Sequence, residues 1–471
     1  LSNDMALGET DFELMGMSGN NVKILLDGIP LIDRGATKQS LSQLDVNSIE
    51  RVEIVEGPMS VVYGTDALAG VINIITKKGD GYSEENTWRV GARVQEESKG
   101  LHNESIDLGF NHKSGLFVNG GYTRNNHGGW QGDLTGREKR WHPKDQALMN
   151  GMFGFQNRNM NVWYRLDFLD EKIFGPNNGS ELQPEKVSDK DFLTKRYTHQ
   201  LQSDWKLDNR LDVHAALSYQ DYKRRTRTTE SDLSTGEKWL SSAEARQDIT
   251  QYKAWIARAT VAWNIAPEFS VQPGVEYQWT QGEGGRIDGT PKVSDLAFFL
   301  SAEYKPWEWL SLRPGVRTFI VADYDAPIAI PSVLTKFKLT KHMDLRLSYA
   351  YGFRSPTLQE LYFSFHNDNH DIDGNPDLKA EYSHNITGSV AYRVLHSEKI
   401  HLTTTLSGFY NDFRDKISLA QNVDIPNYNT YYNIDRYKTV GGSLENSLSW
   451  GGLRANLNVS LIGRYNRYAT G

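Results

Sequence analysis

The chain has 471 residues, of which 38 % are hydrophobic and 11 % aromatic, and it carries a formal net charge of −7 with no cysteine. The absence of cysteine excludes disulfides, thiolate metal sites and cysteine nucleophiles, and the negative charge disfavours nucleic acid as a partner. No apolar run approaches the ~18 residues of a membrane-spanning helix, but low hydrophobicity with 23 Tyr and 12 Trp suits strands that face lipid on one side and a polar interior on the other.

Residues 1–80 have the pattern of a small α/β domain. Two runs rich in β-branched residues, 52–55 and 71–75, are predicted strands, because such residues fit a pleated surface. A further strand is predicted over 22–26, before a turn at Asp27-Gly28. The polar stretch 32–42 is expected to form an apical loop, with a short helix starting near its end.

A long strand-rich region follows this domain. The sequence Gly79-Asp80-Gly81 opens a linker, which we assign to residues 81–87. From residue 88 to 471, polar and apolar residues alternate, as in β-strands with two different faces. A soluble β-sandwich would show the same alternation, so alternation alone does not distinguish a sandwich from a membrane barrel.

The lengths of the connections favour a barrel, because membrane barrels have short turns on one rim and long loops on the other. Short connections are predicted at 112–115, 156–159, 207–210, 265–268, 305–308 and 450–452. Long polar loops are predicted at 125–146, 171–195, 223–247, 281–294, 354–381 and 412–433. By this count about 17 strands are visible, whereas a closed barrel needs an even number. The sequence also begins without the charged and apolar regions of a signal peptide, so we expect the chain to belong to the middle of a longer protein.

Several spaced motifs in the first 80 residues carry a family resemblance. They are Leu25-Leu26-Asp27-Gly28-Ile29-Pro30, Ile49-Glu50-Arg51-Val52-Glu53-Ile54-Val55-Glu56-Gly57-Pro58, Tyr63-Gly64 and Ala67-Leu68-Ala69-Gly70-Val71-Ile72-Asn73-Ile74-Ile75-Thr76. A nucleotide-binding loop is excluded, because no Gly-Lys-Ser/Thr accompanies these glycines. The motifs resemble the plug of TonB-dependent outer-membrane receptors.

The resemblance implies a mainly β fold, a transmembrane antiparallel β-barrel of about 22 strands with an N-terminal α/β plug in its lumen. On this basis, residues 1–80 are the C-terminal part of a plug, and residues 88–471 are a barrel without its C-terminal strands. The resemblance further implies location in the bacterial outer membrane and no intrinsic cofactor. The implied partners are outer-membrane lipid, a TonB-type coupler that would bind the missing N-terminal box, and possible surface lipoproteins.

The segment 353–381 is the most informative loop. Phe353-Arg354-Ser355-Pro356 and Asn375-Pro376-Asp377-Leu378 resemble the FRAP and NPNL boxes of outer-membrane haem receptors, although Ser355 and Asp377 depart from those boxes. The resemblance implies a ligand-binding loop that includes Arg354, Pro356, His366, His370, Asn375, Pro376, Asp377 and Leu378.

Haem receptors place an iron-ligating histidine between the two boxes, and His366 or His370 would fill that role here. Neutral imidazole is a suitable axial ligand for haem iron. The alternative, that these histidines occur at a polar loop tip by chance and bind no iron, is given equal weight. A turn is expected at 367–369 between them. Haem receptors also use a plug histidine, and residues 1–80 contain none.

Other cationic and aromatic residues are candidate contacts for an anionic chelate or a porphyrin. They are Trp130, Trp141 and His142 in the second long loop and Arg224, Arg225, Arg227 and Trp239 in the fourth. The arginines have an equally good alternative role, contact with lipopolysaccharide phosphates. In the plug, Glu50, Arg51, Glu53 and Glu56 are predicted to lock the plug to the barrel wall.

The function implied is TonB-dependent uptake of a scarce iron chelate, haem or a ferric siderophore, with no chemistry performed on the ligand. Cobalamin uptake by the same mechanism is the nearest alternative. An outer-membrane enzyme would need a catalytic constellation at the rim, and a passive porin would lack the plug. The plug motifs disfavour both.

Overall fold

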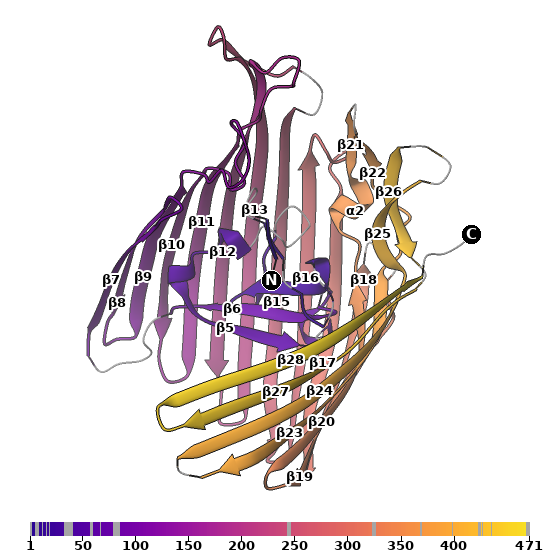
Figure 1. The fold of residues 1–471 in the computed structure, drawn as a ribbon. Helices are drawn as coiled ribbons and strands as arrows, with labels where there is room; N and C mark the ends of the chain where they lie inside the picture. The colour runs from indigo at the N-terminus through magenta and orange to yellow at the C-terminus, as the bar shows by residue number, and fades with distance from the viewer. Residues whose placement is uncertain are drawn as a thin grey trace.

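The structure is a computed structural model, and it describes residues 2–4, 9–11, 13–15, 17, 19–32, 41–56, 60–65, 67–78, 85–242, 246–322, 326–367, 370–397, 399–422, 425, 427–434 and 436–467. In this described part, eighteen strands form one antiparallel sheet curved into a barrel, with a small N-terminal domain inside it (Figure 1). The mainly β fold with a plug in the lumen is therefore confirmed. None of the described helices is long and apolar enough to cross a membrane.

The plug is organised around a four-stranded sheet in the order β4-β3-β6-β5. Its strands are β3 (Val22–Leu26), β4 (Ile29–Pro30), β5 (Ile49–Glu56) and β6 (Gly70–Thr76), accompanied by β1 (Ser2–Asp4), β2 (Glu9–Asp11), helix α1 (Ser60–Tyr63) and 3₁₀ turns at Gly19–Asn21, Leu41–Gln43 and Val46–Ser48. Strand β3 runs parallel to β6, and β5 runs antiparallel to it. The three predicted plug strands are confirmed, and the helix expected near residue 41 is a pair of 3₁₀ turns. Most of the predicted apical loop, 33–40, lies outside the described residues.

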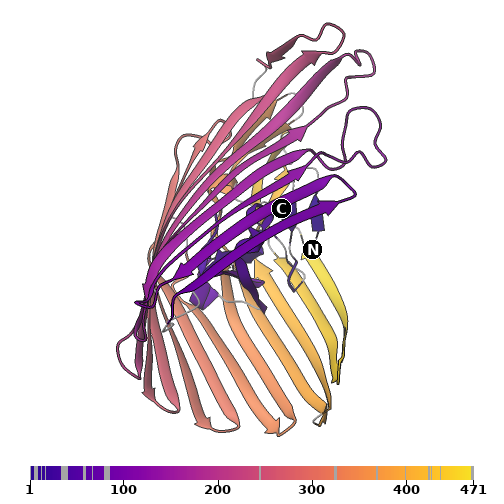
Figure 2. The same cartoon turned by 90° about the vertical axis from the view of Figure 1, so that its left-hand side faces the viewer.

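The barrel strands are hydrogen-bonded to their neighbours in chain order from β7 to β28. They are β7 (Thr87–Glu97), β8 (Leu101–Asn111), β9 (Leu116–His127), β10 (Lys144–Gln156), β11 (Met160–Gly175), β12 (Lys186–Lys206), β13 (Leu211–Asp232), the short β14 (Lys238–Leu240), β15 (Gln247–Ala266), β16 (Phe269–Gly284), β17 (Lys292–Trp307), β18 (Leu310–Ala322), β19 (Ile330–Thr340), β20 (Met343–Arg354), β23 (Glu381–His396), β24 (Ile400–Arg414), β27 (Arg436–Trp450) and β28 (Leu453–Arg467). Figure 2 shows the plug within the curve of these strands.

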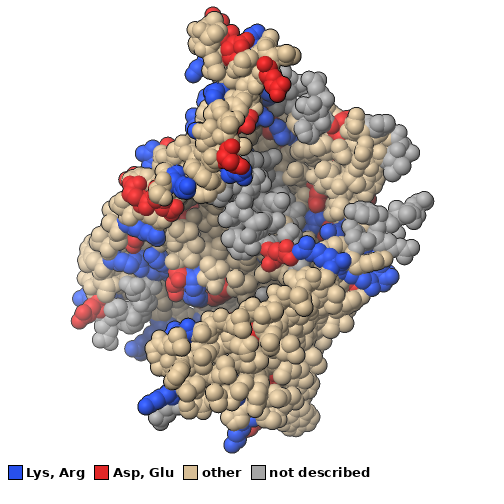
Figure 3. Space-filling view, in the orientation of Figure 1, with Lys and Arg blue, Asp and Glu red and all other residues tan. Residues whose placement is uncertain are grey.

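Alternation along each strand defines an inner and an outer face. In β12, Gln200 and Gln202 are almost fully buried and donate hydrogen bonds to plug carbonyls, whereas Leu201 between them is 46 % exposed on the outer face. Figure 3 shows the outer face of β23, β24, β27 and β28 nearly free of charged side chains. A lipid-facing band has this composition.

The two rims of the barrel differ as predicted. One rim has turns of two to four residues, including 112–115, 207–210 and 451–452, and the other carries the longer connections. Two predicted long loops are wrong in part, because β11, β12 and β13 extend well into 171–195 and 223–247. Polar residues suit a strand that rises above the membrane into water as well as they suit a loop, so polarity alone misplaced these boundaries.

Two of the longer connections join into a second sheet above the barrel, in the order β21-β22-β26-β25. Its strands are β21 (Ser364–Asn367), β22 (His370–Asp373), β25 (Lys416–Gln421) and β26 (Tyr428–Ile434), and helix α2 (Leu358–Tyr362) precedes them. Asn367 pairs with His370, and residues 368 and 369, on which the predicted turn falls, lie outside the described part. We call this four-stranded unit the loop sheet.

Candidate ligand-binding site

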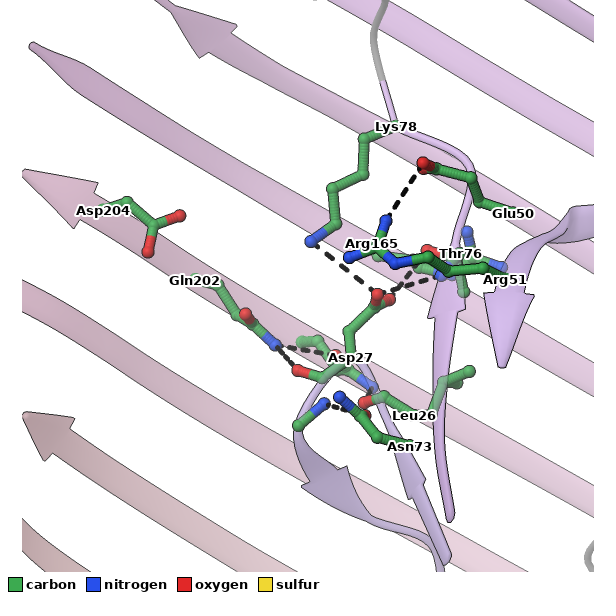
Figure 4. A network of polar contacts seen from close by, with 12 residues as sticks. Leu26, Asp27, Glu50, Arg51, Asn73, Thr76, Lys78, Arg165, Gln202 and Asp204 are labelled. Carbon is green, nitrogen blue, oxygen red and sulfur yellow. Dashed lines mark hydrogen bonds and ion pairs between the residues drawn. The ribbon is translucent and has the colours of Figure 1, made fainter. Parts of the chain in front are cut away.

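The contact between plug and barrel includes both apolar and polar parts, and Figure 4 shows a polar network around Asp27. The Asp27 carboxylate accepts hydrogen bonds from Thr76 N at 3.0 Å and from Thr76 Oγ1 at 2.7 Å, and Lys78 Nζ lies 3.7 Å away. From the barrel wall, Gln202 Nε2 donates to the Asp27 carbonyl at 2.9 Å. The same turn is thus held inside the plug by its carboxylate and against the wall by its carbonyl.

Neutral amides make several further contacts of this kind. Gln220 Nε2 donates to the Pro30 carbonyl at 2.6 Å, and its Oε1 accepts from Ile32 N at 3.0 Å. Gln146 Nε2 donates to the Ser42 carbonyl at 3.0 Å. Water can replace such hydrogen bonds at small net cost, so these contacts oppose movement of the plug less than apolar contacts such as that of Ile29 with Ala216 and Ile256.

The residues predicted to lock the plug pair mainly with one another. Arg51 lies between Glu50 and Glu53 on β5, with N–O distances of 3.1 and 2.9 Å, and about half of its side chain is exposed. The side chain of Glu56 lies outside the described part. A locking role for these four residues stays a prediction, and the described contacts to the wall come from other plug residues.

A buried charge cluster that the sequence analysis missed lies where α1 meets the wall. Glu276 of β16 pairs with Arg258 of β15 at 2.8 Å and with Arg317 of β18 at 2.7 Å, and all three are almost fully buried. The plug approaches through Gly64, where an added Cβ would lie 3.0 Å from Glu276 Oε1. The available signal was the occurrence of charged residues at inner-face positions of three nearby strands.

Arg354, predicted to contact ligand, is buried at the base of the loop sheet. Its guanidinium makes paired hydrogen bonds of 2.8 to 3.0 Å to Glu360 and to Glu381. Glu360 also caps α2 together with Thr357, and Glu381 Oε1 accepts from Ile417 N at 2.5 Å. Arg354 therefore joins α2, β23 and β25.

The base of this loop also contacts the plug. Ser355 N donates to Thr65 Oγ1 at 2.8 Å, and the two hydroxyl oxygens lie 3.2 Å apart. On the plug side, Lys23 Nζ donates to the Thr65 carbonyl at 2.9 Å. Polar contacts therefore run from plug strand β3 through Thr65 to the residue that precedes the buried Pro356.

The Asn-Pro-Asp-Leu segment connects the two halves of the loop sheet. Asn375 Nδ2 donates to the Tyr431 carbonyl at 2.9 Å, and Leu378 packs with Leu361 and Ile417. Pro376 and Asp377 are exposed. Of the eight residues predicted to form the ligand-binding loop, Arg354, Pro356 and Leu378 are thus buried within it.

His366 is exposed on β21 but has polar partners at both ring nitrogens. Nδ1 lies 2.5 Å from Asp371, and Nε2 lies 3.1 Å from Asp373 and 3.0 Å from Ser364 Oγ. The hydrogen bond to Asp371 and the charge of Asp373 raise the pKa of His366, although partial desolvation opposes them. A protonated imidazole has no lone pair for iron. For His370 only the backbone is described.

The predicted arginine cluster is divided between the two faces of β13. Arg224 shares the inner face with Gln220, is 4 % exposed, and places its guanidinium 4.9 Å from the Phe192 ring centroid. Arg225 and Arg227 point to the outer face, where Arg227 pairs with Asp191 at 2.5 Å. All three lie in a strand, so their assignment to a loop is wrong.

Other cations extend the inner face above the plug. Lys190 of β12 faces inwards, and Arg246 Nη1 donates to Ser188 Oγ on that face at 2.9 Å. Arg286 lies 4.2 Å from the Phe365 ring and 3.3 Å from Asp248. Shielding from water, followed by the charges of Arg246 and Arg286, lowers the pKa of Lys190. These residues make a cationic inner wall beside aromatic rings.

The predicted tryptophan contacts lie in other parts of the long-loop rim. Trp130 and Trp141 form a backbone bridge in the 128–143 connection with ring centroids 5.0 Å apart, and His142 follows directly. Trp239 lies on β14 and is 48 % exposed. Their contact with ligand stays a prediction.

A large cavity of about 1580 Å³ lies towards the short-turn rim. Its wall includes Glu303, Arg313, Lys336 and the serines at 348, 389 and 407, with Leu14 and Met15 from the plug region. A cavity of this size, with charged and hydroxyl groups among its wall residues, is able to hold water and a solute.

Comparisons with known proteins agree with this architecture. The model of the TonB-dependent receptor plug domain matches residues 2–71, and the model of the TonB-dependent receptor-like β-barrel matches residues 271–471. The iron-regulated outer membrane virulence protein of Vibrio cholerae is 26 % identical over 440 residues, which cover 87 % of this chain and 61 % of that protein. The chain therefore spans about three fifths of the length of this relative.

Two solved structures show the same fold. The siderophore receptor PirA of Pseudomonas aeruginosa has a TM-score of 0.69 at 16 % identity, covering 96 % of this chain and 85 % of PirA. The copper transporter OprC has a TM-score of 0.76 at 14 % identity, covering 99 % of this chain and 74 % of OprC. From its plug, its barrel and these matches, the chain belongs to the TonB-dependent receptors, β-barrel proteins of the outer membrane.

Proposed function

We propose that the protein takes up an anionic iron chelate of the siderophore type across the outer membrane, with a TonB-type coupler as its energy-transmitting partner. Its relatives include an iron-regulated outer membrane protein and a siderophore receptor. The observation that carries the proposal is the cationic inner wall of Lys190, Arg224, Arg246 and Arg286. Cations beside aromatic rings favour a large anion with a delocalised or aromatic surface.

The polar plug contacts support a transport role. A ligand held by the inner wall would lie above the plug, and its passage requires the plug to shift or leave. Ligand binding outside and force from the coupler would bias the same two states of the plug. The family and its relatives are receptors and transporters, and the proposed cycle needs no reaction on the ligand.

Haem is a weaker candidate for the cargo. The boxes around His366 resemble those of haem receptors, but both nitrogens of His366 face oxygen atoms and its pKa is raised. Haem ligation by His366 would require loss of its proton and of one carboxylate contact. Siderophore binding by cations requires neither.

A fluorescence titration tests the proposal. The full-length protein, titrated with a ferric catecholate complex, is expected to show saturable quenching of tryptophan emission. The triple variant Lys190→Gln/Arg246→Gln/Arg286→Gln is expected to bind at least about tenfold more weakly, because each charge-assisted contact is worth about 1.5–3 kcal/mol. The control Lys113→Gln/Arg158→Gln removes charges on the short-turn rim and is expected to bind normally.

Haemin in the same assay separates the two cargoes. Unchanged catecholate binding by the triple variant would contradict the proposed site. A sharpened Soret band with haemin, lost in His366→Ala or His370→Ala, would instead establish haem as the ligand and name the residue that binds it.

A further inference from the structure

Two histidines lie side by side on the inner face of the barrel, where β23 ends and β24 begins. His396 pairs directly with His401 in the ladder between these strands, and their Nδ1 atoms are 3.0 Å apart. Both side chains are exposed, and the ring centroids are 4.8 Å apart. His401 shares its face of β24 with Ser407, which lines the large cavity. The pair therefore belongs to the short-turn rim, which in outer-membrane barrels faces the periplasm.

An irregularity in β23 brings the two imidazoles together. The register of the β23–β24 ladder shifts between Arg393 and Leu395. Beyond the shift His396 pairs with His401, whereas an unbroken register would place Leu395 opposite His401 and turn His396 to the outer face. Bulges of this kind are frequent where a side chain must be re-aimed for a function. The strand is therefore built to place both rings on one face.

The strands around the pair present no unpaired positive charge beside it. On the far side of His401, the paired residue of β27 is the uncharged Ser449. The single cation of β23, Arg393, donates to Asp344 Oδ2 at 3.2 Å and to the Lys341 carbonyl at 2.7 Å. Electrostatic repulsion from these strands therefore does not oppose the approach of a metal cation to the two rings.

The distance between the two Nδ1 atoms suits a transition-metal ion. At metal–nitrogen distances of about 2.0–2.1 Å, two imidazole nitrogens are about 2.9 Å apart at a right angle and about 3.3 Å apart at the tetrahedral angle. The observed 3.0 Å is nearer to the right angle, which is the angle between neighbouring ligands in tetragonal Cu²⁺ and Ni²⁺ sites. Only a small adjustment of the hairpin separates it from the tetrahedral value that Zn²⁺ prefers.

We propose that His396 and His401 form a binding site for a divalent transition-metal ion, with Cu²⁺ bound more tightly than Ni²⁺ or Zn²⁺. Each ring donates the lone pair of Nδ1 to the metal and carries its proton on Nε2. The described residues add no third histidine or carboxylate to the pair, so water completes the coordination. The site is separate from the cationic inner wall, which lies above the plug at the other end of the barrel.

A copper titration of the full-length, untagged protein tests this inference. Bound Cu²⁺ is counted by equilibrium dialysis, and its ligands are identified by electron paramagnetic resonance, in which coordinated imidazole nitrogens split the signal. The double variant His396→Ala/His401→Ala is expected to lose one equivalent of tightly bound Cu²⁺ together with its two-nitrogen signal. Each single variant is expected to bind that equivalent on the order of 10²-fold more weakly, because two ligands held together gain about this factor over one.

His112→Ala is the matched control, and compact migration on unheated gels verifies the folding of each variant. His112 is also a histidine of the short-turn rim, but its Nδ1 lies 2.8 Å from Ser114 Oγ instead of a second imidazole, so this variant should keep the full equivalent. Equal copper content in the wild type and the double variant would overturn the inference, as would an equal loss in His112→Ala. Displacement of Cu²⁺ by Mg²⁺ as effectively as by Zn²⁺ would indicate oxygen ligands and equally contradict an imidazole site.

Discussion

Arg354 is expected to stabilise the loop sheet far more than an exposed arginine does, because its removal would leave two buried carboxylates without their cationic partner. Its side chain is 3 % exposed, and those of Glu360 and Glu381 are 10 % and 2 % exposed. Removing one partner from such a network costs on the order of 3–5 kcal/mol. Arg354→Ala should therefore make the segment 355–380 sensitive to limited proteolysis in the folded protein.

Arg393→Ala is the matched control for this experiment. Arg393 pairs with Asp344 at 3.2 Å, but 45 % of its side chain is exposed, and exposed pairs contribute about 0–1 kcal/mol. Comparable cleavage of both variants would show that the buried network does not hold the loop.

The pKa of His366 predicts a pH dependence of the loop sheet. Because Asp371 and Asp373 raise this pKa above its usual value of 6.5, the folded hairpin holds the proton more tightly than the unfolded chain. Its contribution to stability is fully present below about pH 6.5 and is lost as pH rises through the higher folded-state pKa. NMR titration of the His366 ring should report the raised pKa, and Asp371→Asn should lower it. An unshifted titration in the wild type would refute the pairing.

At the level of single elements, α1 is expected to depend on Gly64. Gly64 has φ +78°, and an added Cβ would approach both Glu276 and Arg317 at 3.0 and 3.1 Å. Gly64→Ala therefore adds a steric contact to the cost of the left-handed backbone, which is about 1–2 kcal/mol. The expected result is a looser plug, measured as more frequent open events in planar-bilayer recordings.

Gly28→Ala separates these two effects. Gly28 also has a left-handed backbone, with φ +82°, but its Cβ would meet no atom within 4 Å. This variant should bear the backbone cost without the contact at the wall. If both variants leak equally, the charge cluster around Glu276 is not what seats the plug.

The elements differ in how well their sequence predicts them. Alternation and turn spacing predicted the barrel strands and the short-turn rim, because lipid and lumen impose opposite polarities on successive residues. The ends of β12 and β13 were misplaced, since above the membrane both faces meet water. The loop sheet was not predicted, because its parallel pairing of β22 with β26 joins segments about 57 residues apart and leaves no periodic signal.

The candidate site was predicted less well than the fold. The sequence suggests that Arg354 is an exposed, unpaired cation, since arginine is rarely buried unless paired. Its two partners are six and 27 positions away, so the pairing is not visible in the local sequence. By contrast, the alternation of inner and outer positions along β13 was sufficient to assign Arg224 to one face of the strand and Arg225 and Arg227 to the other. The strand boundary, rather than the residue type, was the missing information.

At the scale of the whole molecule, removal of residues 1–80 distinguishes a plugged receptor from a passive porin. The plug lies within the barrel and contacts its wall through many side chains. Deletion is expected to raise single-channel conductance severalfold, because water and ions would fill the space that the plug leaves. Conductance equal to that of the intact protein would favour an open pore.

The parallel pairing of β3 with β6 has a mechanical consequence for the plug. Five residue pairs, from Val22–Gly70 to Leu26–Ile74, join these strands. A pull on the N-terminal side of β3, resisted from the C-terminal side of β6, acts along the strands and loads the whole ladder in shear. The amide contacts to the barrel are scattered and yield one at a time. Under tension, the plug sheet should therefore leave the wall as a unit before its own strands separate.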